Sequence, residues 1–426
     1  MAERRLIDDC FLTDRDRLRH DEALAILRER IRPVVEAERL ALSDAAGRIL
    51  AETVTSPRPV PGADNAAVDG YAFAHADYAA TGGYFPVAAR IAAGHPSPVP
   101  HMPGTAVRIF TGGVIPAGAD TVAMQEDCEP HIQKGHAFVA IPPGLKPGAN
   151  RRKAGEDLAA GDAAAQAGMR LRPQEVAAIA STGRDTVAVY RRLRVALAST
   201  GDEVVRPGTP LNEGQVYDSN HFLLSALLRT ADCQLTDAGV LGDEAESVLD
   251  ALRRITAGHD LVISTGGASR GEEDHLVTAL DALGTRHLWQ LAVKPGRPMG
   301  FGQIGGCPVL ALPGNPVAAF VCFLLYVRPM LTVMGGGTWP EPQRFQVAAG
   351  FEIASRKQGR REFLRGRLAV GRDGGSIAKK FPRDGSGLIT SLREADGLIE
   401  IAEDVATVRL GDPVTFMPFS GFGLVP

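Results

Sequence analysis

The residues best suited to chemistry stand in loops of glycine and hydroxyl side chains that follow strand-like segments. One such loop occupies residues 264–269 and leads into the acids Glu272, Glu273 and Asp274. Glycine lets a backbone approach a phosphate closely, hydroxyl groups donate hydrogen bonds, and a helix N-terminus adds positive potential. This composition indicates an anion site, although the three acids directly after it would repel an anion.

Two further loops have the same character, at residues 199–203 and 312–316. None of the three ends in the Gly-Lys-Ser/Thr of a Walker loop or carries the spaced glycines of a dinucleotide-binding loop. One such loop alone is most often a tight strand–helix turn, whereas three in one domain favour a binding site. The candidate ligand-binding residues are Ser199, Thr200, Gly201, Ser264, Gly266, Gly267, Ser269, Pro313, Gly314 and Asn315.

Acidic residues accompany these loops. Glu203 and Asp274 each follow a glycine loop, and Asp218 and Asp243 lie near expected helix starts. Carboxylates at such positions are often only helix caps. Carboxylates beside a phosphate loop are also how proteins hold Mg²⁺, which binds one or two of them together with water and substrate oxygens.

Positive charge comes from two segments. Lys294 and Arg297 stand in a turn flanked by prolines and would offer fixed charge to a phosphate or another oxyanion. Residues 356–367 contain six basic side chains and, among nearby acids, only Glu362, so this stretch is either a solvated strand edge or a wall for phosphate. These residues together indicate a phosphorylated ligand and a divalent metal, without identifying the ligand.

The elements that must position these residues follow from the hydrophobic pattern. Strand-like and helical segments alternate over residues 191–335, which predicts a doubly wound α/β domain with a mostly parallel sheet. Ligands of such sheets collect at the carboxyl ends of the strands, where the three loops fall. In the helix after residue 218, Ser219 or Asn220 is the expected N-cap.

The remaining segments predict smaller domains. Short apolar runs between turn residues indicate a β domain at 56–148 and a last β domain at 338–426. Residues 1–55 and 149–190 are expected to be helical and linker segments, with one amphipathic helix carrying Leu24, Leu27 and Ile31 and another starting at Pro173.

The overall composition excludes several classes of protein. A formal net charge of −4 does not fit a bulk nucleic-acid binder. The N-terminus lacks the apolar core of a signal peptide, and the longest apolar run, residues 317–327, is far shorter than the ~20 residues that span a bilayer, so we expect a buried helix there. Five scattered cysteines without a C-x-x-C pair fit a reducing cytoplasm rather than a disulfide framework or a zinc site.

Eight motifs occur in an order that is similar to a known family. They are "DNAAVDGYA", "RIFTGGVIPAGADTVAMQED", "RRKAGED", "STGDE", "YDSN", "ISTGGASRGEED", "KPGRPMGFG" and "LPGNPVAAF". From about Asp21 to the C-terminus the chain resembles the molybdopterin molybdenumtransferases, known as MoeA in bacteria and as the E domain of gephyrin in animals. Each motif alone is modest, but the eight in order are specific.

The resemblance implies an architecture and a reaction. It implies an elongated homodimer whose chains have a helical domain in two segments, a β domain, an α/β molybdopterin-binding domain and a C-terminal β-barrel-like domain. The implied reaction inserts molybdate into adenylylated molybdopterin and releases AMP with Mg²⁺, at a site between the α/β domain of one subunit and the β domain of the other. The implied partners are these small molecules, a second copy and other proteins of cofactor biosynthesis, with no nucleic acid and no membrane.

The family's functional residues match particular positions here. The matching catalytic residues are Asp64, Glu203, Asp243, Asp274, Lys294 and Arg297, with Glu203, Asp243 and Asp274 as the metal ligands. Arg297 replaces a lysine common in bacterial members and keeps the charge but not the geometry. Further ligand-binding matches are Thr111, Asp157, Arg365 and Ser391.

Two other functions are compatible with parts of the chain. Single-domain relatives of the α/β unit adenylylate molybdopterin with ATP, but the flanking domains argue against that step. A non-catalytic scaffold is the second alternative, and the presence of Asp64, Glu203, Asp243 and Asp274 argues against it, because a scaffold needs none of these acids.

Overall fold

The computed structural model describes residues 17–242, 244–266, 275–371 and 374–424. The chain divides into two compact units. The larger unit contains Met1–Glu38, Gly47–Ala51 and Ala188–Pro426, and the smaller unit contains Arg39–Ala46 and Glu52–Val187. The finer division into four domains stays a prediction.

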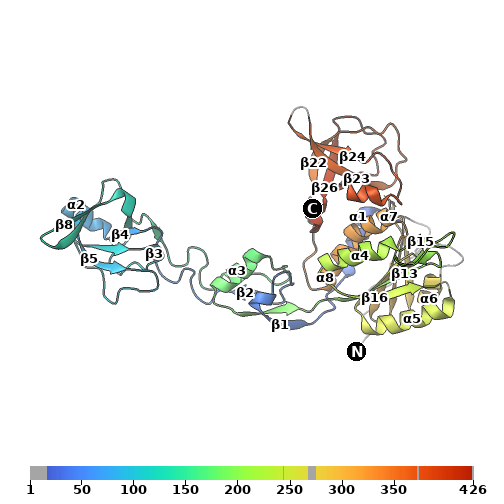
Figure 1. The fold of residues 1–426 in the computed structure, drawn as a ribbon, viewed down its shortest axis with the longest axis horizontal. Coiled ribbons are helices and arrows are strands. Elements are labelled where there is room, and N and C mark those ends of the chain that lie inside the picture. The colour runs from blue at the N-terminus through green and yellow to red at the C-terminus, as the bar shows by residue number, and fades with distance from the viewer. Residues whose placement is uncertain (1–16, 243, 267–274, 372–373, 425–426) are drawn as a thin grey trace. The chain divides into compact units, whose positions relative to one another are not determined.

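A six-stranded sheet forms the centre of the larger unit (Figure 1). Four neighbouring strands are parallel, and two antiparallel pairings add the last two strands at one edge, as expected of a mostly parallel doubly wound sheet. In order across the sheet the strands are β16 (Gln234–Leu241), β13 (Arg194–Thr200), β17 (Leu261–Thr265), β21 (Cys307–Leu312), β20 (Pro298–Ile304) and β18 (Thr285–Gln290).

Helices cover both faces of this sheet because alternate strand residues supply two apolar surfaces. Val195, Leu197 and Ile263 pack with α1, α4 and the α7–α8 helix. Ala196 and Val262 pack with α5 and α6 on the opposite face. The helices are α1 (His20–Arg30), α4 (Ser219–Thr230), α5 (Ala245–Gly258), α6 (His275–Leu283), α7 (Pro316–Cys322) and α8 (Arg328–Met334).

The apolar run at residue 317 forms the buried helix expected from the sequence. A π-helical stretch, Phe323–Val327, joins α7 to α8, and Tyr326 within it is fully buried. The joined helix, Pro316–Met334, is longer than the apolar run and could cross a membrane by length and composition alone, but 83% of its most apolar window is buried inside the protein. It is therefore packed as a core helix.

The N-cap of α4 differs from the expected one. Asp218, rather than Ser219 or Asn220, caps the helix, since its carboxylate accepts a hydrogen bond from the backbone N–H of His221 at 2.9 Å. The helix thus begins at Ser219, and the side chain of Asn220 is released for another contact.

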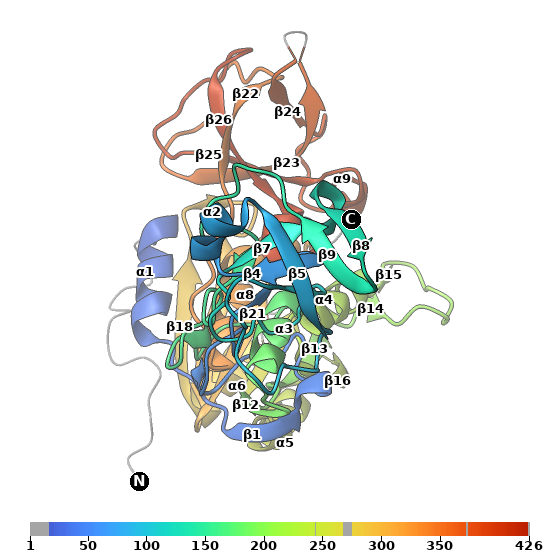
Figure 2. The same ribbon diagram turned by 90° about the vertical axis from the view of Figure 1, so that its left-hand side faces the viewer.

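The C-terminal part of the larger unit is a closed five-stranded barrel (Figure 2). Its strands are β23 (Arg361–Val370), β24 (Ser376–Lys380), β22 (Phe345–Ala349), β26 (Pro413–Pro418) and β25 (Gly397–Ile401), and pairing of β23 with β25 closes it. A short strand from the α/β segment, β19 (Val293–Lys294), adds to the same sheet beside β23. A short helix, α9 (Ile389–Arg393), precedes β25.

The smaller unit is built on a mixed sheet of six strands. In order these are β7 (Thr121–Met124), β4 (Gly70–Phe73), β6 (Ala106–Ile109), β5 (Tyr84–Ile91), β9 (His136–Ala140) and β8 (Glu129–Gln133). Beside it lies the pair β3 (Asn65–Ala66) and β10 (Arg151–Arg152). The expected helix at Pro173 is confirmed as α3 (Pro173–Ser181). The carboxylate of Glu175 caps its N-terminus by accepting a hydrogen bond from the backbone N–H of Arg172.

Candidate functional site

The three loops predicted to bind an anion follow β13, β17 and β21. Because these strands are parallel neighbours, their carboxyl ends lie at one edge of the sheet. The backbone N–H of Gly266 donates to the carbonyl of Leu312 at 3.0 Å, which joins the second loop to the third. A Cβ built on Gly266, whose φ is +92°, would lie 2.5 Å from Thr200 Oγ1, so the second loop also touches the first.

Ser199 is held by a buried carboxylate. Its hydroxyl donates to Asp218 Oδ2 at 2.5 Å, and Arg206 Nη1 lies 3.4 Å from the same oxygen. Asp218 also caps α4 through its other oxygen. The sequence placed Asp218 near a helix start, but its hold on Ser199, 19 positions earlier, depends on how the loop after β13 folds back.

Asn220 joins α4 to the two other loops. Its Nδ2 donates to Thr265 Oγ1 and to the carbonyl of Gly314, each at 2.7 Å. Its Oδ1 is buried and has no hydrogen-bond partner among the described residues. An amide oxygen left in this way can accept a hydrogen bond from a ligand N–H. Sequence reasoning missed this role, although "YDSN" carried the signal.

Glu203 is exposed at the end of the first loop. A Cβ built on Gly201 would lie 2.3 Å from Glu203 Oε2, so the carboxylate lies over the loop backbone. The other expected metal ligands, Asp243 and Asp274, and the expected loop residues Gly267 and Ser269 lie outside the described residues. Within the described ranges no three His, Cys, Asp or Glu side chains gather as a metal site.

The barrel brings Arg365 and Ser391 to the start of α7. Arg365 is buried, and its Nε donates to Ser391 Oγ at 3.0 Å while its Nη2 donates to the carbonyl of Gly385 at 3.2 Å. The carbonyl of Ser386 in turn accepts the backbone N–H of Val317 at 3.0 Å. The segment 383–391 therefore lies directly against the loop at residues 312–316. Burial lowers the pKa of Arg365.

Lys294 has an acidic partner that the sequence did not reveal. Its Nζ lies 3.7 Å from Oε2 of the buried Glu362, which also faces Arg356 at 3.7 Å and Arg360 at 3.5 Å. Arg297, three residues further along the same turn segment, is exposed. Three cations around one carboxylate leave net positive charge, which still suits an oxyanion.

The basic stretch meets more acids in the fold than Glu362, the one acid near it in the sequence. Arg361 pairs with Asp21, Glu400 and Glu403 at 2.8–3.0 Å. These acids come from α1, β25 and the residues after β25, which are distant in sequence, so a local count of charges could not find them.

In the smaller unit, Asp64 and Thr111 are each fixed by a neighbour. Asp64 accepts the backbone N–H of Ala154 at 2.8 Å and lies 3.5 Å from Arg151. Thr111 donates through its backbone N–H and its hydroxyl to Asp69 Oδ1, at 2.8 and 2.7 Å. These two bonds hold the pKa of Asp69 below its ordinary value. Asp69 is a further residue that sequence reasoning missed.

Asp157 stands apart from these contacts. Its side chain is exposed, and its backbone N–H donates to the carbonyl of Val60. The structure thus places Asp157 on the surface of the smaller unit and leaves its role a prediction.

Comparison with known proteins identifies the family. Family models match residues 18–183 as the MoeA N-terminal region, domains I and II, residues 196–333 as a probable molybdopterin-binding domain, and residues 347–419 as the MoeA C-terminal region, domain IV. The chain belongs to the MoeA family. It is 35% identical over 401 residues to a molybdopterin molybdenumtransferase of Haemophilus influenzae, covering 94% of this chain and 98% of the relative.

Other MoeA relatives agree along the length of the chain. Molybdopterin molybdenumtransferase 2 of Mycobacterium tuberculosis is 33% identical, with 92% of this chain and 96% of the relative covered. The crystal structure of a molybdopterin biosynthesis MoeA protein from Pyrococcus horikoshii OT3 matches with a TM-score of 0.79 and 27% identity, over 95% of this chain and 100% of that one. The family resemblance and the mixed α/β and β fold expected from the motifs are confirmed.

Proposed function

We propose that this MoeA-family protein transfers molybdenum to molybdopterin, and that it acts on adenylylated molybdopterin and molybdate with release of AMP. The observation that carries the proposal is the joining of the three strand-end loops with one another, and the contact of Val317, directly after the third loop, with the segment that the buried Arg365 holds. The loops offer backbone N–H groups and hydroxyls to a phosphorylated pterin, and the barrel offers a cation to an oxyanion.

Each group has a distinct task in this proposal. Ser199, held by Asp218, and the loops joined by Asn220 bind and orient the pterin phosphate. Arg365, Lys294 and Arg297 hold molybdate, the oxyanion that carries the metal to be transferred, beside the dithiolene. Positive charge fixed before the reaction stabilises the negative charge of the two substrates at no cost in reorganisation.

A magnesium ion is part of the proposal. Glu203 fits such an ion, since its exposed carboxylate lies over the first phosphate loop and Mg²⁺ binds one or two carboxylates with water and substrate oxygens. Asp243 and Asp274 are the other proposed ligands. When bound, the ion would neutralise the pyrophosphate that is cleaved.

A reaction assay tests this function directly. The purified protein is given adenylylated molybdopterin, molybdate and Mg²⁺, and AMP is measured. Arg365→Gln should lower the rate of AMP release strongly, while Arg367→Gln, an exposed arginine of the same strand, is the matched control. AMP release no faster than without protein would refute the proposal, and consumption of ATP with free molybdopterin would favour the adenylyltransferase instead. Binding without either reaction would favour a scaffold.

We further propose a cytoplasmic homodimer in which Asp64 and Thr111 of one copy serve the site of the other. Mixing Asp64→Ala protein with Arg365→Gln protein tests this, because one of the two sites in each mixed dimer would combine intact residues. Random exchange of subunits should then restore about a quarter of the wild-type activity. No recovery after exchange would mean that each site is completed within one chain.

A further inference from the structure

One face of strand β23 carries three side chains that lie outside the barrel's own apolar core. Arg361, Phe363 and Arg365 alternate along the strand, so their side chains point to the same side. Phe363 belongs to the core cluster of the α/β segment, whereas Leu364, on the opposite face, belongs to the barrel's own core. β23 is therefore one of the strands through which the barrel contacts the rest of the larger unit, together with β25 through Leu398 and β26 through Met417.

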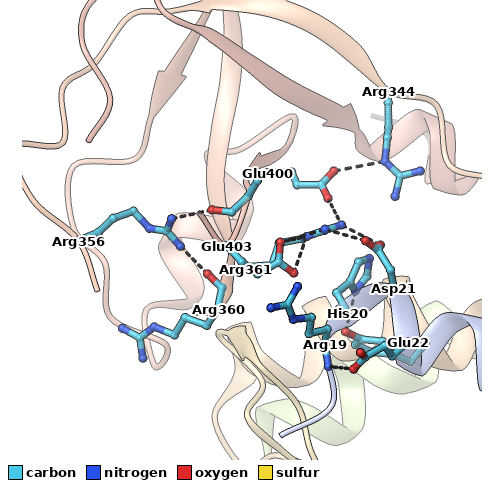
Figure 3. Close-up of polar contacts among 12 residues, drawn as sticks. Arg19, His20, Asp21, Glu22, Arg344, Arg356, Arg360, Arg361, Glu400 and Glu403 are labelled. Atoms are coloured by element: carbon cyan, nitrogen blue, oxygen red, sulfur yellow. Dashed lines mark hydrogen bonds and ion pairs between the residues drawn. The ribbon is translucent and has the colours of Figure 1, made fainter. Parts of the chain in front are cut away.

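Arg361 binds acids of the C-terminal domain and also an acid of α1 (Figure 3). Arg361 donates to two acids of the C-terminal domain, Glu400 at 2.9 Å and Glu403 at 3.0 Å. Its Nη1 and Nη2 also donate to the two oxygens of Asp21, at 2.9 and 2.8 Å. Since the barrel's own acids fix the guanidinium, Asp21 receives a donor pair that is already oriented.

His20 completes the contact beside Asp21. Its ring is fully buried, Nδ1 lies 2.8 Å from the hydroxyl of Tyr326, and the ring meets Tyr326 and Phe363 edge-on, with centroids 5.5 and 5.2 Å away. Burial, and then the nearby Arg361, lower the pKa of His20 to about 3, so the ring is neutral at ordinary pH. One residue thus joins α1, the π-helical stretch and β23.

We propose that Asp21, through Arg361, is a positioning residue for the oxyanion-binding side chains of the barrel. Arg361 lies four residues before Arg365 on the same face of one strand, and Arg365 holds the segment 383–391 that contacts the start of α7. Clamping β23 against α1 fixes the register of Arg365 and Ser391 over the loop at residues 312–316. The link to molybdate rests on the proposed function.

Asp21→Asn tests the proposal, because it keeps the shape of the side chain and removes the charge. Asp21→Glu keeps the charge. The matched control is Glu341→Gln, which removes an exposed ion pair between α1 and the segment before the barrel, Arg28–Glu341. We expect Asp21→Asn to raise the KM for molybdate about fivefold, the size expected of one well-oriented surface pair. The KM for adenylylated molybdopterin, Asp21→Glu and Glu341→Gln should stay close to wild type.

Hydrogen exchange gives a second readout that needs no reaction. In Asp21→Asn the backbone amides of 383–391 and the amide of Val317 should exchange faster, and in Glu341→Gln they should not. Unchanged exchange would overturn the clamp, and faster exchange with an unchanged KM for molybdate would show that the clamp does not position the site. If wild-type protein releases no AMP but the exchange changes as expected, the proposed function fails while the clamp stands.

Discussion

Gly266 offers a sharp test of how closely the loops after β13 and β17 approach one another. Its φ of +92° disfavours any side chain, and a Cβ there would lie 2.5 Å from Thr200 Oγ1 and 2.8 Å from the carbonyl oxygen of Thr200. The second of these atoms is backbone and cannot turn away. Gly266→Ala therefore has two costs, the positive φ and the overlap with the loop after β13.

The two costs can be separated with a matched glycine. Gly305 also has a positive φ, +56°, but a Cβ there would meet nothing within 4 Å. Gly305 lies in the turn between β20 and β21, at the start of β21 and so at the opposite edge of the sheet from the loops. Gly305→Ala should cost about 1–2 kcal/mol for the backbone alone. Gly266→Ala should cost about 1–3 kcal/mol more, because overlap in a packed site adds that amount.

Urea unfolding followed by circular dichroism measures both variants against wild type. AMP release gives the functional consequence: Gly266→Ala should lower kcat/KM about tenfold or more, since the loop must move, while Gly305→Ala should leave it near wild type. Equal destabilisation of the two variants would refute the close approach of the loops. Equal activity of both would mean that this approach does not matter for the substrate.

Three further predictions concern single side chains. His20 has a pKa near 6.5 in the unfolded chain and about 3 in the folded protein, so the free energy of unfolding falls as the pH drops between these two values. Wild-type protein should therefore lose about 2 kcal/mol between about pH 7 and about pH 5 through this residue. His20→Asn should remove that loss, as urea unfolding at the two pH values would show. Burial acts to raise the pKa of Asp260, but hydrogen bonds from Arg191 and Arg194 outweigh it and hold the pKa at about 2. The stabilisation from the ionised Asp260 is present above about pH 3.8 and is lost as the pH falls through about 2. Asp260→Asn should therefore lower the free energy of unfolding by about 1 kcal/mol at neutral pH and by less in acid. Acid titration of the unfolding of both proteins measures this difference. Asn220→Ala removes two buried hydrogen bonds and should weaken molybdopterin binding about tenfold in calorimetry, and unchanged affinity would contradict its role in joining the loops.

The sequence predicted what depends on local pattern. The alternation of strands and helices was enough for a doubly wound sheet, and the positions of glycine after strands were enough for three loops at one edge, because both follow from the period of the pattern and from parallel topology. Even so, the N-cap of α4 was displaced by one residue to Asp218, since neighbouring polar residues compete for that position.

Partnership between distant side chains could not be predicted from the sequence. Glu362 meets Lys294 because β19 pairs with β23. Asp69 meets Thr111 because β4 pairs with β6 in the smaller unit. Such pairs are set by strand register and by long-range packing, which no local motif encodes. The family motifs supplied Lys294 and Thr111 without their partners, so the residues that orient the site emerged only from the structure.

The pairing of β19 with the barrel strand β23 has a consequence for where the chain can be cut. Val293 and Lys294 pair with Arg361 and Glu362, and four residues after Lys294 the chain enters β20 of the α/β sheet. A truncation between α8 and β22 would look clean in the sequence, yet it would leave the edge of β23 unpaired and bury Glu362 without its lysine. A chimera that exchanges the barrel between relatives must therefore include residues 293–294. The barrel with its paired strand is a structural unit made of two separate segments of the sequence.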